Sequence, residues 1–276
     1  MSVTLKSEDK QILYTDQKIP TDAMDYRDAF LYGIVEGITE FLPISSTGHL
    51  VITSEIIGSG QWDVSQQEAL HAYLIVIQGG AILAVAIIYW SRIWSMWIGI
   101  FGDNPQGRKL LINIVIAFIP AAILGLLLDS IIEEFLFGLL PVAIALFLGA
   151  FLMIWAEKRK QEGEKNPNRE TSKNLESLRL KDSLFIGFLQ CVAMCPGTSR
   201  SMMTIVGGYF VGLERKYAAE FSFLLGLVTL TAAAGYKTIT KWETMSYHLS
   251  IGPVLIGCLV AGVSAAFSVV WLVRYL

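Results

Sequence analysis

Two polar stretches decide the fold: EGITEFLPISSTGH, residues 36–49, and CPGTSRS, residues 195–201. Both interrupt long apolar sequence, and both place Ser and Thr residues shortly after a proline. Charged and hydrogen-bonding groups are costly at membrane depth, where they mark function by default. The two stretches occupy corresponding positions in two halves of the chain, which predicts a site shared between two repeats.

An alignment of the two halves pairs Gly33 with Gly187. After a one-residue gap it also pairs Pro43 with Pro196, and Ser46 with Ser199. Broken hydrophobic segments at matching places in two halves are typical of inverted repeats around a midplane site.

The composition indicates a membrane protein. Of the 276 residues, 54% are hydrophobic and 16% are charged, and the mean hydropathy is +0.54. Soluble domains usually carry about a quarter charged residues. The net charge is only -3 and the basic residues gather in loops, so no nucleic-acid partner is expected.

Five apolar stretches are long enough to cross a hydrocarbon core of roughly 30 Å. They are residues 72–90, 110–128, 139–156, 221–236 and 251–273. Lys and Arg gather after the first and third of them, which predicts that those two loops are cytoplasmic and that the N-terminus is outside. Residues 30–42 and 184–194 are too short to cross. We therefore expect each to be one arm of a re-entrant hairpin, with the two tips meeting near the middle of the membrane.

The expected fold is an all-α polytopic membrane protein with two inverted-topology repeats, each containing a re-entrant helical hairpin. The predicted organisation is a polar N-terminal extension (1–26), a first repeat (27–156), a basic cytoplasmic loop (157–181) and a second repeat (182–276).

Glu36 and Glu40 are spaced i, i+4, so both carboxylates lie on one face if this segment is helical. Two carboxylates on one face repel each other unless a proton or a metal ion lies between them. They suit a hard cation such as Mg²⁺ or Ca²⁺, or a general acid and base pair. The alternative is two glutamates at the membrane interface.

Four further residues of the first stretch, Ser45, Ser46, Thr47 and His49, place hydroxyl groups beside a side chain able to take their proton. The alternative is a turn in which the hydroxyls satisfy backbone groups freed by Pro43.

The second stretch contains Arg200, flanked by Ser199 and Ser201. A guanidinium is always charged and suits bidentate capture of phosphate. The alternative partner for this arginine is a protein carboxylate, Glu36 or Glu40.

The stretches EGITEFLPISSTGHL (36–50), VIQGGAILAV (76–85), PGTSRS (196–201) and EFSFLL (220–225) resemble the bacitracin-resistance family of undecaprenyl-diphosphate phosphatases. The resemblance covers about residues 30–276. It implies a bacterial inner-membrane enzyme that removes the terminal phosphate of undecaprenyl diphosphate, which recycles the lipid carrier of cell-wall synthesis and confers bacitracin resistance. It also implies an interlocked inverted-repeat fold, and we expect the pocket to open on the outer, periplasmic side.

Carried over by motif position, the resemblance implies that Ser46 is the nucleophile or its close helper. Ser45 and Thr47 would bind the phosphates, His49 would act as base or acid, and Arg200 would hold the diphosphate. Glu36 and Glu40 would bind a divalent cation or handle protons. Second-tier candidates for substrate contact are Gln78, Ser199, Ser201 and Glu220, and for Gln78 and Glu220 helix–helix hydrogen bonding is an equal alternative.

Three departures from the family pattern stand out. Leu74 occupies a position where the family often has an acidic residue, so no role of that acid can be transferred. Met202 replaces a common glycine, which puts the local backbone geometry in question. The sequence ends at Leu276, where the family usually has one further span; either the C-terminus is cut short or the last helix is dispensable.

The expected partners are the polyprenyl diphosphate substrate and membrane lipids, and a homodimer is left open. A transporter or flippase of polyprenyl phosphates is the alternative function, because inverted repeats with broken helices are also a transporter architecture. The hydroxyl and histidine cluster favours an enzyme, since transport needs no nucleophile. An inactive scaffold is a third reading, against which the complete Glu, Ser, His and Arg set argues.

Overall fold

The computed structural model describes residues 24–59, 64–136, 138–165, 173–240, 242 and 250–276. Nearly all of the predicted extension 1–26 lies outside these residues. The described helices are α1 (Tyr26–Thr39), α2 (Ser46–Ile57), α3 (Val64–Ile88), α4 (Trp90–Ile100), α5 (Pro105–Phe135), α6 (Leu139–Glu164), a short 3₁₀ turn η2 (Leu175–Ser177), α7 (Leu180–Val192), α8 (Arg200–Phe210), α9 (Arg215–Thr240) and α11 (Ile251–Tyr275).

Within the described residues, five helices are long and apolar enough to cross a membrane: α3, α5, α6, α9 and α11. They contain the five predicted stretches except for the end of the first, because α3 stops at Ile88. The prediction of an all-α polytopic membrane protein is confirmed.

Two boundaries differ from the prediction. Residues 90–100, expected as span end and loop, form the separate helix α4, which Arg92 ties to Glu220 of α9 through an ion pair of 2.6 Å. Helix α6 continues to Glu164, into the predicted loop 157–181. The polar end of α6 finds partners there, because Lys160 Nζ donates to the Leu213 carbonyl at 2.7 Å. Hydropathy does not predict a hydrogen bond between a lysine of α6 and a distant backbone carbonyl, so it places the end of the helix too early.

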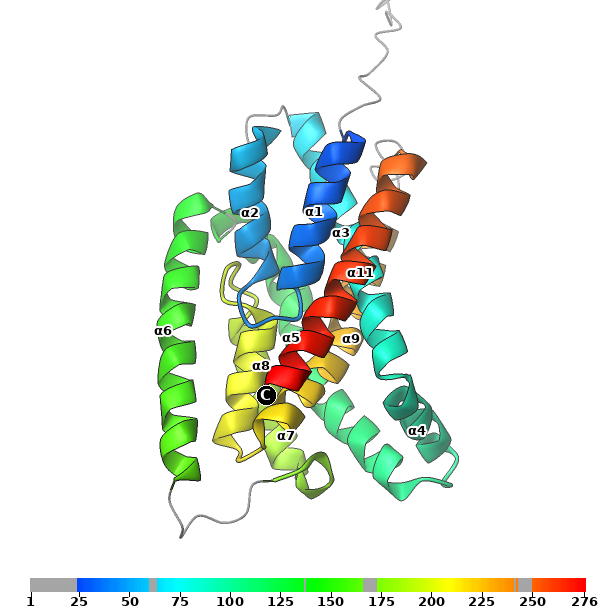
Figure 1. The fold of residues 1–276 in the computed structure, drawn as a ribbon, viewed down its shortest axis with the longest axis vertical. Helices are drawn as coiled ribbons and strands as arrows, with labels where there is room; N and C mark the ends of the chain where they lie inside the picture. Colours follow the sequence, from blue (N-terminus) through cyan, green and yellow to red (C-terminus); the bar gives the residue numbers. More distant parts are fainter. Residues whose placement is uncertain (1–23, 60–63, 137, 166–172, 241, 243–249) are drawn as a thin grey trace, which may run out of the picture.

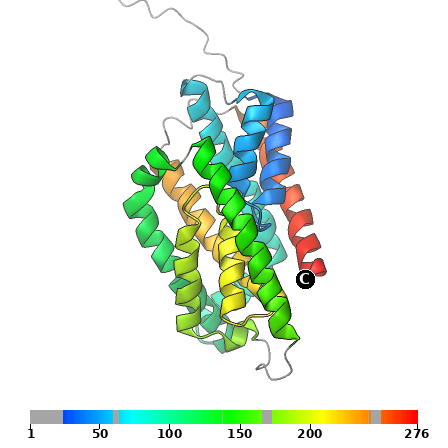
Figure 2. The ribbon, with the colours of Figure 1, turned by 90° about the vertical axis from the view of Figure 1, so that its left-hand side faces the viewer.

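Both short segments form hairpins (Figure 1). Helices α1 and α2 lie in the upper half of the view and α7 and α8 in the lower half, and the turns that join each pair meet at mid-height. This is the arrangement that the short arms predicted. Helix α6, green in Figure 2, runs along the molecule and contacts both α2 and α8.

The halves interlock, because α1 packs on α11 and α7 packs on α5. Small residues allow the close approach. A Cβ added to Gly37 would lie 2.3 Å from the Ala261 carbonyl oxygen, and one added to Gly187 would lie 2.4 Å from that of Ala117. Each predicted repeat therefore packs against the hairpin of the other and holds it in place.

The contact between α3 and α11 predicts different effects on stability for alanine substitutions at two neighbouring glycines. A Cβ at Gly80 would lie 2.0 Å from the Cys258 carbonyl oxygen, whereas one at Gly79 would meet nothing within 4 Å. We expect Gly80→Ala to destabilise the protein by about 1–3 kcal/mol through forced separation of the helices. Gly79→Ala should be neutral or stabilising, since alanine favours helix by about 1 kcal/mol. Thermal unfolding in detergent measures both, and equal shifts would contradict the packing described.

Candidate active site

Each hairpin turns through a serine with an unusual backbone conformation. Ser45 has φ 68° and Ser199 has φ 59°, and no other non-glycine residue in the described part of the chain has a positive φ. Each is the N-cap of the next helix: Ser45 Oγ accepts from the Gly48 amide and Ser199 Oγ from the Met202 amide, both at 3.3 Å. Such strained residues persist only where the surrounding structure imposes them, often at functional sites.

The strained serines correct the alignment of the halves. Ser45, not Ser46, is the structural counterpart of Ser199, and the pairing of Ser46 with Ser199 was wrong. The spacing from Gly33 to Ser45 equals that from Gly187 to Ser199, so no gap is needed. Ser46 therefore corresponds to Arg200, and each is the first residue of its helix.

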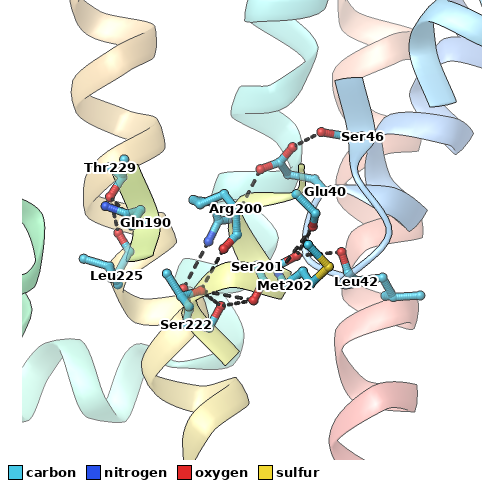
Figure 3. A network of polar contacts seen from close by, with 12 residues as sticks. Glu40, Leu42, Ser46, Gln190, Arg200, Ser201, Met202, Ser222, Leu225 and Thr229 are labelled. Carbon is cyan, nitrogen blue, oxygen red and sulfur yellow. Dashed lines mark hydrogen bonds and ion pairs between the residues drawn. The ribbon is translucent and has the colours of Figure 1, made fainter. Parts of the chain in front are cut away.

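Ser46, Glu40 and Arg200 form a continuous polar chain between the two hairpin tips (Figure 3). Ser46 Oγ donates to Glu40 Oε2 at 2.5 Å, and Arg200 Nη2 donates to Glu40 Oε1 at 3.2 Å. Glu40 is buried and the Arg200 side chain is 11% exposed. Glu40 thus binds a hydroxyl with one oxygen and a guanidinium with the other. The protein carboxylate considered as an alternative partner of Arg200 is present, and it is Glu40.

The Arg200 guanidinium has three further features. Its Nη1 donates to the Ser222 carbonyl at 3.1 Å, and its Cζ lies 5.5 Å from the centre of the Phe41 ring. Its Nε is buried and has no hydrogen-bond partner among the described residues. A buried unsatisfied donor is unusual and calls for an explanation. Here the free donor suits an anionic ligand.

Two predicted phosphate contacts, Ser199 and Ser201, have other neighbours in the structure. Ser201 is fully buried, and its Oγ donates to the Leu42 carbonyl of the first hairpin at 2.6 Å. A hydroxyl has a single proton, and Ser201 donates it to this carbonyl. Because Leu42 belongs to the first hairpin and Ser201 to the second, the bond joins the two tips. Ser199 Oγ lies 3.1 Å from Ser201 Oγ and caps α8. In this structure both serines stabilise the turn that presents Arg200.

Glu36 lies beside Glu40, as the i, i+4 spacing predicted, and beside Gln78 of α3. It is buried, and its Oε1 has no hydrogen-bond partner among the described residues. The gap-free alignment places Gln190 opposite Glu36. Gln190 is also buried, with its Oε1 3.3 Å from Thr229 Oγ1 of α9. The first hairpin thus has a carboxylate where the second has a neutral amide.

His49 and Thr47 lie on the first turn of α2. His49 Nδ1 is 2.8 Å from the Ser45 carbonyl, which only accepts hydrogen bonds, so Nδ1 is the donor of this bond. Ser46 directs its single proton to Glu40, which makes Glu40 the nearest base to the hydroxyl. Thr47 is half-buried beside Ser46. The roles of His49 and Thr47 stay predictions.

The carboxylates of the site bear on whether it could hold a divalent cation. Among the described residues, no group of three or more His, Cys, Asp or Glu side chains is placed to hold a metal ion. Mg²⁺, however, is commonly bound by one or two carboxylates together with substrate phosphates. The unpartnered Oε1 of Glu36 fits such a shared site, whereas both oxygens of Glu40 are already bound.

Glu220 lies outside this chain of contacts, because its carboxylate pairs with Arg92. Helix–helix bonding, the alternative considered for it, is what the structure shows. Phe41, Ser222 and Thr204 were not predicted from the sequence. Thr204 Oγ1 lies 2.6 Å from Ser222 Oγ, which fixes the residue whose carbonyl binds Arg200. A backbone carbonyl has no sequence signal, although Ser222 lies within EFSFLL.

Comparison with known proteins identifies the family. The family described as bacitracin resistance protein BacA matches residues 29–276. The chain is 40% identical over 249 residues to the undecaprenyl-diphosphatase of Polaromonas naphthalenivorans, covering 90% of this chain and 86% of that protein. It is 43% identical over 249 residues to undecaprenyl-diphosphatase 1 of Chromobacterium violaceum, covering 90% and 87%. The chain therefore belongs to the BacA family of bacitracin resistance proteins.

Proposed function

We propose that this protein hydrolyses undecaprenyl diphosphate to undecaprenyl phosphate and inorganic phosphate. The observation that carries the proposal is the chain Ser46–Glu40–Arg200, in which a hydroxyl, a proton acceptor and a cation lie in mutual hydrogen-bond contact. Relatives that share about 40% of the sequence are named for this activity. The proposed activity accounts for the bacitracin resistance after which the family is named.

In the proposed mechanism, Arg200 binds the terminal phosphate with Nε and with the Nη2 that Glu40 now occupies. Glu40 then accepts the proton of Ser46, whose Oγ attacks the terminal phosphorus. The bond from phosphorus to the bridging oxygen breaks, and undecaprenyl phosphate leaves. In a second step a water attacks the phosphorus, the bond from Ser46 Oγ to phosphorus breaks, Oγ takes back the proton held by Glu40, and inorganic phosphate leaves. Direct attack by a water at the same carboxylate is the competing route. Either relies on positioning and charge neutralisation, as phosphoryl transfer generally does.

We further propose that Glu36 holds a divalent cation, Mg²⁺ or Ca²⁺, together with oxygens of the diphosphate. When bound, the cation supplies neutralisation of the phosphate charge. Gln78 orients Glu36 from α3 in this proposal. Glu40, which the sequence also suggested as a ligand, serves Ser46 and does not bind the cation.

We also propose where the protein resides and how it is oriented. The protein would reside in the bacterial inner membrane, with the α1–α2 hairpin entering from the periplasmic side. The basic residues at the ends of α6 and α7, such as Lys158 and Lys181, support this orientation, since cytoplasmic loops are enriched in Lys and Arg. Formation of a homodimer stays a prediction.

The test is phosphate release from undecaprenyl diphosphate by the purified protein in detergent, with and without a chelator. We expect turnover that stops on chelation and returns with Mg²⁺ or Ca²⁺, and turnover that is lost in Ser46→Ala while the protein stays folded. Unchanged turnover in chelator would overturn the cation proposal alone. Binding of the lipid without turnover by the unmutated protein would instead favour a polyprenyl-phosphate transporter.

A further inference from the structure

The Arg200 guanidinium lies against the ring of Phe41, which lies at the tip of the first hairpin. Arg200 Cζ is 5.5 Å from the ring centre, and Phe41 is fully buried. The negative face of an aromatic ring attracts a cation, and the attraction is stronger where the pair is desolvated. The contact joins the two hairpins at the centre of the site.

Helix α9 fixes both partners of this contact. The Phe41 ring packs edge-to-face on Phe223, with ring centres 5.8 Å apart and planes at 83°. The preceding residue, Ser222, accepts a hydrogen bond from Arg200 Nη1 at 3.1 Å. Two consecutive residues of one helix thus hold the arginine and the ring beneath it. Phe223 is itself packed against Tyr89, with ring centres 6.1 Å apart.

Glu40 and Phe41 both contact Arg200, but they differ in which N–H donors of the guanidinium they leave free for a ligand. Glu40 occupies an edge of the guanidinium, where the N–H donors are, and a phosphate must compete with it for that edge. An aromatic ring attracts the cation through its face and uses no N–H donor. The ring of Phe41 therefore remains in contact when a phosphate replaces Glu40. Without it, an arginine released by its carboxylate would keep only the bond to Ser222.

We propose that Phe41 is a substrate-positioning residue: its ring, held by Phe223, keeps Arg200 aimed at the diphosphate after Glu40 releases it. The inference rests on the proposed function for the identity of the ligand. It predicts that weakening the attraction between ring and cation weakens binding of the diphosphate without changing the packing.

The test replaces Phe41 with 4-fluoro-, 3,5-difluoro- and 3,4,5-trifluorophenylalanine, which nearly keep the shape of the ring and progressively reduce the negative charge of its face. The probe is a methylene-diphosphonate analogue of undecaprenyl diphosphate, whose Kd is measured beside KM and kcat for the natural lipid. We expect Kd and KM to rise stepwise with fluorination and by about tenfold in Phe41→Leu, the scale of a partly desolvated cation–π contact.

Two controls separate positioning from packing. Phe221→Leu removes an equally buried ring of α9 and should lower the unfolding midpoint with little effect on Kd. In an Arg200→Ala background, fluorination at Phe41 should leave Kd unchanged, because the ring acts through the arginine. The inference would be overturned if fluorination left Kd unchanged. It would also be overturned if Phe41→Leu and Phe221→Leu changed Kd equally. Stepwise weakening of binding in a protein that releases no phosphate would uphold it and reject the hydrolase.

Discussion

Arg200→Ala is expected to lower kcat/KM for undecaprenyl diphosphate by roughly 10³-fold or more, in line with the loss of a phosphate-binding arginine in other phosphoryl transfer enzymes. The substitution removes the bonds to Glu40 and Ser222 and leaves a buried carboxylate without its cation. The measurement is initial phosphate release at several lipid concentrations, beside a thermal unfolding curve.

Arg200→Lys should recover only part of the activity, because lysine keeps the charge but not the flat fork of donors. The matched control is Arg274→Ala near the end of α11, a cation outside the site, which should retain activity. An Arg200→Ala protein that is folded and active would remove the second hairpin from the mechanism.

Glu40→Gln is the other change with a large expected effect, a loss of about 10²–10⁴-fold in kcat if the carboxylate serves as the general base. The amide keeps the size of the side chain but accepts no proton from Ser46 and does not neutralise Arg200. Steady-state kinetics separate the expected fall in kcat from any change in KM.

Glu55→Gln, an exposed glutamate of the neighbouring helix α2, is the control and should behave as the unmutated protein does. Glu36→Gln should instead change the concentration of divalent cation needed for half-maximal activity. Activity in Glu40→Gln equal to that of the control would shift the base to another residue, with His49 the first to examine.

The sequence predicted the hairpins because their arms are too short to cross a membrane, and it predicted the five spans from length and hydropathy. Helix α4 could not be predicted in this way, because hydropathy records neither its packing on α5 nor the pairing of its Arg92 with the distant Glu220. The gap that the sequence suggested in the alignment of the two halves was wrong because the letters do not record backbone conformation. Ser46 and Ser199 look equivalent as letters, whereas backbone conformation makes Ser45 the counterpart.

Within the site, residue types pointed to Glu40, Ser46 and Arg200, but not to their arrangement. The direct contact between Glu40 and Arg200 joins segments far apart in the sequence. Ser201 looked like a phosphate ligand, yet its proton goes to the carbonyl of Leu42. Such use of backbone acceptors depends on how two turns meet, which no local pattern records.

The central claim is that the two hairpin tips form one catalytic unit through Glu40 and Arg200. A double-mutant cycle on kcat/KM with Glu40→Gln, Arg200→Lys and the double variant tests it most directly, since these mild changes leave measurable activity. Residues in contact commonly couple by about 0.5–3 kcal/mol, whereas distant ones are additive. We predict a double variant clearly more active than the product of the single losses would give. Strict additivity, with all variants folded, would contradict a shared site.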